Sequence, residues 1–162
     1  MVLSRILHLA QPFIGGTSPP FITEQGLKNT LLESESCGKN NADREVLQIV
    51  VEAAQVCSDI CKSDTHGDGT NLKLDRLKEL VSRVPPGSAG GNSLVWAYFI
   101  GAAESESTDD RLFFTGCLIE IYKGSNWQNI LIGLGTLEQL WQHPQRQSWR
   151  QNLPQLSTAF IM

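Results

Sequence analysis

The apolar residues between positions 43 and 142 recur at steps of three and four, the spacing that places side chains on one face of a helix. This pattern predicts helices at about 43–62, 72–84, 93–104, 109–123 and 127–142. Residues 93–104 are apolar on nearly every side, so we expect that helix at the centre of the fold. No run alternates between apolar and polar residues as a half-buried strand does. The predicted fold is therefore all-α, an irregular bundle of about five to six helices.

Capping residues and helix breakers predict where these helices end. Asp43 is the expected N-cap of the first helix, because its carboxylate can accept hydrogen bonds from the free amides of the first turn. The Pro85-Pro86-Gly87 run is expected to end the second helix, Gly124 the fourth and Pro144 the last. A glycine inside a helix costs about 1 kcal/mol relative to alanine, so we expect another helix to cross closely at each interior glycine. These are Gly101, Gly116, Gly133 and Gly135.

The first 42 residues predict less regular structure than the rest of the chain. Residues 1–10 favour a short helix over a secretory signal, because charged and polar side chains interrupt their apolar run. Glycine and proline pairs and a polar cluster predict irregular structure over 11–42. The expected division is therefore 1–42, a short helix with an irregular, loop-rich segment, and 43–162, a helical domain. The longest uncharged apolar run is too short for a membrane span, so no membrane association is expected.

Composition narrows the function classes. The chain of 162 residues is 41% hydrophobic and 19% charged, as in one soluble globular domain. Thirteen Lys and Arg against 17 Asp and Glu give a net charge of −4, which argues against a surface that neutralises phosphates of nucleic acid. The four cysteines form no C-x-x-C pair, so no structural zinc site and no other metal or cofactor is expected. Cys57 and Cys61 lie on an apolar helix face and are expected to pack as small hydrophobes.

Two clusters of acidic residues resemble metal sites but have simpler explanations. The segment from Asp64 to Asp75 has the acidic and glycine spacing of a calcium loop, but His66 replaces an oxygen ligand, and a polar turn is the prediction. A second acidic cluster is expected to be a solvated helix end; it contains Glu104, Glu106, Asp109 and Asp110. No nucleophile elbow, phosphate loop or metalloprotease motif is present, so no catalytic residues are predicted and the chain is not expected to be an enzyme.

Ordered sequence blocks from about Leu77 to Met162 resemble the end of a known family. The blocks are 80–87 (LVSRVPPG), 94–100 (LVWAYFI), 101–105 (GAAES), Arg111 with Phe113-Phe114, Glu120-Ile121-Tyr122, Asn129-Ile130, 137–141 (LEQLW), Trp149 and 153–157 (LPQLS). In this order they resemble the fungal-specific transcription factor domain, the helical regulatory region of binuclear zinc cluster transcription factors. The first 76 residues fit this family only loosely, as helices that would precede the core.

The resemblance implies a nuclear, non-enzymatic regulator of metabolic genes, including those of secondary metabolism. In that family a separate N-terminal zinc cluster reads DNA, and this sequence has neither its cysteine spacing nor a basic segment. Direct DNA binding by this chain alone is therefore not expected, and its partners are expected to be proteins, either other transcription regulators or the chain itself. The expectation is a truncated relative, a gene model lacking its 5′ exons, or a stand-alone partner of other regulators.

Large apolar side chains on the predicted helices and the tail are the candidate interaction residues. They are Trp96, Phe99, Trp141, Trp149 and Phe160. The simpler interpretation of the first four is that they belong to the core, because of their positions in apolar stripes, whereas the apolar tail with Phe160 is expected to dock on the bundle or on a partner. Two other functions stay open at this stage, a small helical accessory protein or enzyme of a metabolic gene cluster and an inactive fragment. A small-molecule effector also stays open.

Overall fold

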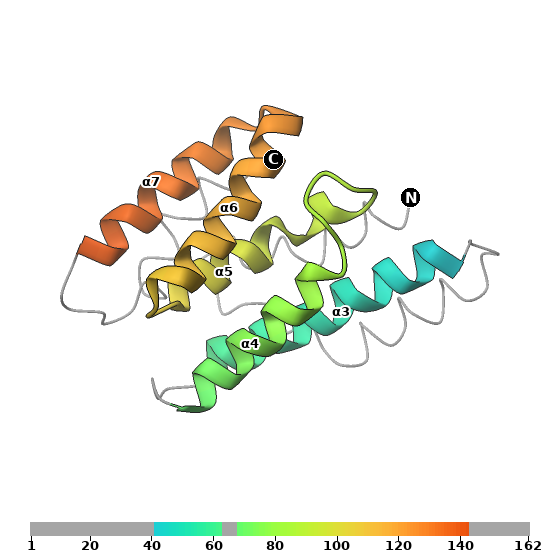
Figure 1. The fold of residues 1–162 in the computed structure, drawn as a ribbon, viewed down its shortest axis with the longest axis horizontal. Helices are drawn as coiled ribbons and strands as arrows, with labels where there is room; N and C mark the ends of the chain where they lie inside the picture. The colour runs from blue at the N-terminus through green and yellow to red at the C-terminus, as the bar shows by residue number, and fades with distance from the viewer. Residues whose placement is uncertain (1–40, 63–67, 143–162) are drawn as a thin grey trace.

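The computed structural model describes residues 41–62 and 68–142, and these residues are helical apart from short connections. Their elements are α3 (Asn41–Lys62), α4 (Asp68–Ser82), the 3-10 helix η2 (Gly91–Leu94), α5 (Val95–Glu104), α6 (Thr108–Ser125) and α7 (Gln128–Gln142) (Figure 1). No strand occurs in this part of the chain, which confirms the all-α prediction. The short helix expected at 1–10 and the irregular segment up to residue 40 lie outside the described residues.

α5 lies at the centre of the described helices, as its sequence predicted. The pair α3 and α4 run side by side in opposite directions against one part of α5, and α6 and α7 pack against another (Figure 1). Every residue of α5 is buried except Trp96 and Ala103. A helix that touches all four others has no side left for solvent, and this explains its uniformly apolar sequence.

The first two helices begin earlier than the sequence predicts. α3 starts at Asn41, so Asp43 lies in its first turn and is not the N-cap. Its carboxylate is then placed near the positive end of the helix dipole. α4 starts at Asp68, and the polar turn expected from Asp64 to Asp75 is therefore helical from Asp68 onward. The buried side of the helix reaches back as far as Thr70, a polar residue that is 7% exposed.

The connection from α4 to α5 depends on two glycines. α4 ends at Ser82, just ahead of the proline pair, as predicted. Gly87 and Gly90 then have φ of 79° and 87°, a left-handed conformation that other residues rarely adopt. The chain enters α5 through a 3-10 turn over Gly91–Leu94, where a continuous helix from residue 93 was expected.

Asn126, and not Gly124, ends α6. Gly124 lies inside the helix, and Asn126 adopts the left-handed conformation with φ 55° while its amide donates to the carbonyl of Tyr122. Asparagine tolerates this conformation better than most residues, so the expected glycine stop was unnecessary. At the other end Ser107 is the N-cap, and its hydroxyl accepts a hydrogen bond from the amide of Asp110.

The interior glycines have different surroundings. A Cβ built on Gly101 would lie 2.5 Å from the Phe114 ring, so α6 crosses α5 closely there, as predicted. Gly116 and Gly135 have nothing within 4 Å of such a Cβ, and the close crossing expected at both is wrong. Gly133 is buried on α7.

Candidate functional site

Three of the sequence blocks, 101–105, Arg111 and 137–141, meet where α5 turns into α6. Ser105 is fully buried, and its hydroxyl and amide both donate to the carbonyl of Gly101, at 2.6 and 3.1 Å. The carbonyl of Ser105 accepts a hydrogen bond from Nε of Arg111 at 3.1 Å. These bonds close the end of α5 and fix the direction in which α6 leaves it.

Trp141 brings the last turn of α7 to the same place. Its indole Nε1 donates to the carbonyl of Ala102 at 3.2 Å, and the guanidinium carbon of Arg111 lies 4.9 Å from the centre of its ring. Such a cation–π contact contributes about 0.5–2 kcal/mol, more when it is desolvated. We call the set Gly101, Ala102, Ser105, Arg111 and Trp141 the α5–α6 corner.

The acidic cluster expected at this helix end is not uniformly solvated. Glu106 and Asp109 are exposed, but Glu104 is only 3% exposed because it lies in the last turn of the central helix. Asp110 is half-buried and pairs with Lys78 of α4, with 2.6 Å between Nζ and Oδ1. The expectation of a solvated helix end is therefore wrong for Glu104 and Asp110.

The Lys78–Asp110 pair joins α4 to α6. The hydrogen bond from Lys78 is the main reason that the pKa of the Asp110 carboxyl is lowered, and the Ser107 hydroxyl contributes to the same shift. Nζ of Lys78 also lies 5.4 Å from the centre of the Phe113 ring. One lysine thus neutralises a carboxylate at the start of α6 and covers an aromatic face beside it.

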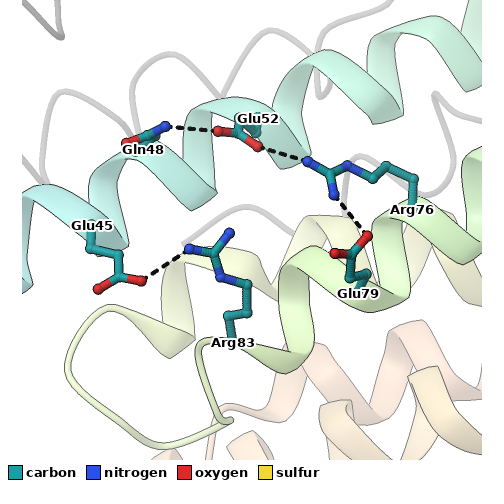
Figure 2. A network of polar contacts seen from close by, with 6 residues as sticks. All are labelled: Glu45, Gln48, Glu52, Arg76, Glu79 and Arg83. Atoms are coloured by element: carbon teal, nitrogen blue, oxygen red, sulfur yellow. Dashed lines mark hydrogen bonds and ion pairs between the residues drawn. The ribbon is translucent and has the colours of Figure 1, made fainter.

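A second polar cluster joins α3 to α4 on the surface, as Figure 2 shows. Arg76 bonds to Glu52 at 3.3 Å and to Glu79 at 2.7 Å. Gln48 donates to Glu52 at 3.0 Å, and Arg83 pairs with Glu45, also at 3.0 Å. We call these six residues the α3–α4 network. Its members are solvent-accessible, so each pair contributes about 0–1 kcal/mol.

The candidate interaction residues are placed differently from one another. Phe99 is 5% exposed and belongs to the core, and Trp96 and Trp141 are half-buried against it. Trp141 belongs to the α5–α6 corner. Trp149 and Phe160 lie outside the described residues. A role in binding a partner stays a prediction for all five.

The cysteines of the described helices pack with the core. Cys57 is fully buried, and burial, followed by the charge of Cys61, raises the pKa of its thiol. Burial also raises the pKa of Cys117 to about 11. Cys61 packs against the core, as predicted. The thiols of Cys57 and Cys117 are therefore protonated at neutral pH, a form that is a poor nucleophile.

Neither a metal centre nor a membrane span is found in the described part of the chain. No group of three His, Cys, Asp or Glu side chains there could hold an ion. Asp68, Gly69 and Asp75 of the calcium-like segment lie in α4, whereas Asp64 and His66 are outside the described residues. None of the helices at 41–62 and 68–142 combines the length and the apolarity needed to cross a bilayer.

The geometry defines an all-helical domain in which three helices meet at a buried, hydrogen-bonded corner. The chain belongs to the fungal specific transcription factor domain family, whose model matches residues 56–157. This is a family of transcription factor domains and not of enzymes, and the nucleus is the location expected for it. No curated protein and no solved structure matches the chain.

The match locates the family domain more broadly than the sequence blocks did. It begins inside α3, so α4 and residues 56–62 of α3 belong to the domain, whereas the resemblance had placed only loosely fitting helices up to residue 76. It contains every residue of the α5–α6 corner. It also continues beyond the end of α7 to residue 157.

Proposed function

We propose that this chain is a regulatory module of transcription that acts in the nucleus through contacts with other proteins, and that it controls metabolic genes, including those of secondary metabolism. The observation that carries the proposal is the family match over residues 56–157, which includes the whole central helix and both helices that close on it. The function of the family is transcription, and the described helices show no competing metal centre.

Protein contacts, and not contacts with DNA, are the mode of action that the chain's charge supports. DNA binding depends on Lys and Arg side chains that displace counterions from phosphates. The chain has a net charge of −4, and in the α3–α4 network two arginines are already paired with three glutamates. A module of this charge would reach promoters through a partner that carries the DNA-binding element.

Deletion of the gene, followed by RNA sequencing, tests the proposal. We expect altered transcripts that fall mainly in metabolic gene clusters, and a fluorescently tagged chain that accumulates in the nucleus. Complementation with the wild type and with Arg76→Ala, a change at the exposed surface, should restore the transcripts. Unaltered transcripts in the deletion strain, together with a tagged chain outside the nucleus, would overturn the proposal.

The α5–α6 corner provides a loss-of-function comparison. Arg111→Ala removes the bond to the Ser105 carbonyl and the contact with Trp141, so we expect failed complementation with reduced protein abundance. Protein levels measured by immunoblot in the same strains separate loss of folding from loss of a specific contact. Full complementation by Arg111→Ala at normal abundance would show that the corner is dispensable for the regulatory role.

A further inference from the structure

α6 carries apolar residues on two opposite sides. Its inner side packs in the core through Phe114, Leu118 and Ile121, which are all buried. On the outer side Leu112 is 65% exposed and Ile119 is 40% exposed. A surface helix of a single domain needs an apolar stripe only on the side that faces its core, so the outer residues need another explanation.

The outer residues follow the spacing at which two helices pack side by side. We call the following five residues the outer seam of α6: Asp109, Leu112, Gly116, Ile119 and Lys123. Their alternating steps of three and four are the heptad repeat of a coiled coil, which keeps one narrow stripe facing a partner helix. Both charged members and both large apolar members are exposed, so the seam is accessible to a helix of another chain.

Gly116, at the middle of the seam, is a second observation in favour of such a contact. Nothing lies within 4 Å of a Cβ built on it, so no packing between the described helices requires a glycine there. A glycine inside a helix lowers the stability of that helix relative to alanine. Because it has no side chain, however, it lets a second backbone approach closely. The glycine therefore favours a seam that another helix covers.

We propose that a second copy of this chain covers the outer seam, so that two α6 helices pack antiparallel about a two-fold axis at Gly116. In a two-fold contact, residues equidistant from Gly116 meet at the same level. Asp109 then lies opposite Lys123 of the second copy, and the same pair recurs on the other side of the axis. The levels of Leu112 and of Ile119 of the second copy differ by one residue's rise, about 1.5 Å. The seam is thus complementary to itself in both charge and apolarity.

Charge selects the antiparallel orientation. A parallel pair in register would place Asp109 against Asp109 and Lys123 against Lys123, and like charges repel each other. In the antiparallel pair, Lys123 lies between Asp109 of the second copy and Glu120 of its own chain, to which it already bonds at 2.7 Å. One lysine would then bridge two carboxylates at each end of the contact.

The exposed apolar residues of α7 do not form a comparable surface. Leu131 is 43% exposed and Ile132 is 58% exposed, but consecutive residues lie about 100° apart around a helix and do not share one narrow stripe. Glu138 is the single charged residue of α7, so a second copy of this helix would offer it no opposite charge. The outer seam of α6 is therefore the better surface for a contact between copies.

Analytical ultracentrifugation of the purified full chain over a range of concentrations tests the proposal. We expect a dimer whose fraction rises with concentration. Leu112→Asp places a charge in the contact twice per dimer and should raise the dissociation constant of the dimer more than about tenfold. Leu72→Asp is the matched control, because Leu72 is an apolar residue of α4 that is 72% exposed, and it should leave the dissociation constant unchanged.

Gly116→Leu tests the close approach of the two helices separately. The new side chain starts from a Cβ that meets nothing within 4 Å, so circular dichroism should show an unaltered helix content. In the dimer it would push the two backbones apart, because the distance between packed helices depends on the side chains at their contact. We expect a dissociation constant raised about tenfold.

A mixture of charge variants gives an independent measurement. Asp109→Lys and Lys123→Glu each place like charges at both ends of the seam, and each should weaken its own dimer about fivefold. In an equimolar mixture of the two variants, every pair of opposing positions again carries opposite charges. The mixed dimer should therefore be about as stable as the wild-type dimer, and added salt should reduce all of these differences.

Four results would overturn the proposal. The first is a wild type that stays monomeric up to millimolar concentration. The second is a dimer that neither Leu112→Asp nor Gly116→Leu weakens. The third is a dimer that Ile132→Asp dissociates while those two variants do not, which would assign the contact to α7. The fourth is a mixed dimer that is no tighter than the dimers of the two charge variants.

Such a dimer would be one of the protein contacts through which the proposed regulatory module acts, and it rests on that proposed function only to this extent. Sedimentation of the purified chain measures the dimer without reference to transcription, so the two proposals fail separately. A monomeric chain whose deletion alters metabolic transcripts would overturn the dimer and leave the regulatory role standing.

Discussion

The two ends of the described chain are held together by different chemistry. α3 and α4 are joined on the surface by pairs between charged side chains, whereas α5, α6 and α7 meet at a corner where side chains bond to buried backbone carbonyls. A solvent-exposed ion pair contributes little, because water screens it and two long side chains lose freedom. A buried carbonyl that loses its partner costs its full desolvation penalty. The corner should therefore be far more sensitive to substitution than the network.

The family match separates the same two regions. All residues of the α5–α6 corner lie within residues 56–157, whereas the α3 members of the network, Glu45, Gln48 and Glu52, precede the match. The corner thus belongs to the part of the chain that defines the family. The network lies half outside it, because three of its six residues precede residue 56.

The largest expected effect is at the crossing of α5 and α6. Gly101→Ala would place a methyl group 2.5 Å from the ring of Phe114, which is fully buried, so the ring or the backbone would have to shift. We expect a loss of about 1–3 kcal/mol in the free energy of unfolding, measured by urea denaturation. Gly116→Ala is the control, because its Cβ meets nothing within 4 Å, and it should stabilise the protein by up to about 1 kcal/mol. Equal effects of the two substitutions would contradict the close crossing.

A smaller effect is expected from the hydroxyl of Ser105. Ser105→Ala removes the buried bond to the Gly101 carbonyl, and we expect a loss of about 1 kcal/mol. Ser82→Ala is a matched control, because its hydroxyl bonds to the Lys78 carbonyl at the same distance of 2.6 Å but at the surface. Its loss should be within about 0.5 kcal/mol. Thermal unfolding of the two variants side by side decides whether burial makes the difference.

The stability that the Lys78–Asp110 pair contributes should depend on pH, and this is the pair that joins α4 to α6. Because the folded pKa of Asp110 is lowered from 3.8, its contribution to stability is present above that pH and is lost as the pH falls through the folded value. Asp110→Asn should therefore be less stable than the wild type at neutral pH, with a difference that shrinks below pH 3.8. Asp109→Asn, exposed in the same first turn, controls for the helix dipole. A difference that stays constant with pH would argue against the ion pair.

The smallest effect is expected in the α3–α4 network. Arg76→Ala breaks both of its bonds but should cost less than about 1 kcal/mol. Added salt should reduce the difference from the wild type, since screening weakens exposed charge pairs. Denaturation midpoints at low and high ionic strength check this. A loss as large as that of Gly101→Ala would contradict the expectation that the corner is more sensitive to substitution than the network.

Helix periodicity predicted the fold well, because the stripes at three- and four-residue steps are a local property of the sequence. The helix ends were less predictable. Asn126 and Gly124 are both plausible stops, and only the backbone conformation shows that Asn126 ends α6. Likewise Asp43 satisfies the rule for an N-cap, yet α3 begins at Asn41.

The α5–α6 corner could not be derived from local pattern. Its bonds join Ala102 to Trp141 and Ser105 to Arg111, and nothing in the spacing of those residues indicates which side chain meets which carbonyl. The ordered blocks did contain all of these residues, so their order was the available signal. The Lys78–Asp110 pair and the α3–α4 network depend on how helices pack, and no single-helix rule reveals them.

The central place of α5 determines how the protein can be divided. The connection at 83–90 looks like a natural point at which to cut the chain into two fragments. Yet α5 packs on α3 and α4 as well as on α6 and α7, so a cut there would expose to water the apolar side of α5 that faces α3 and α4, and the sides of those two helices that cover it. We therefore expect the two regions to unfold as one cooperative unit, and a fragment that begins at α5 to aggregate instead of folding alone.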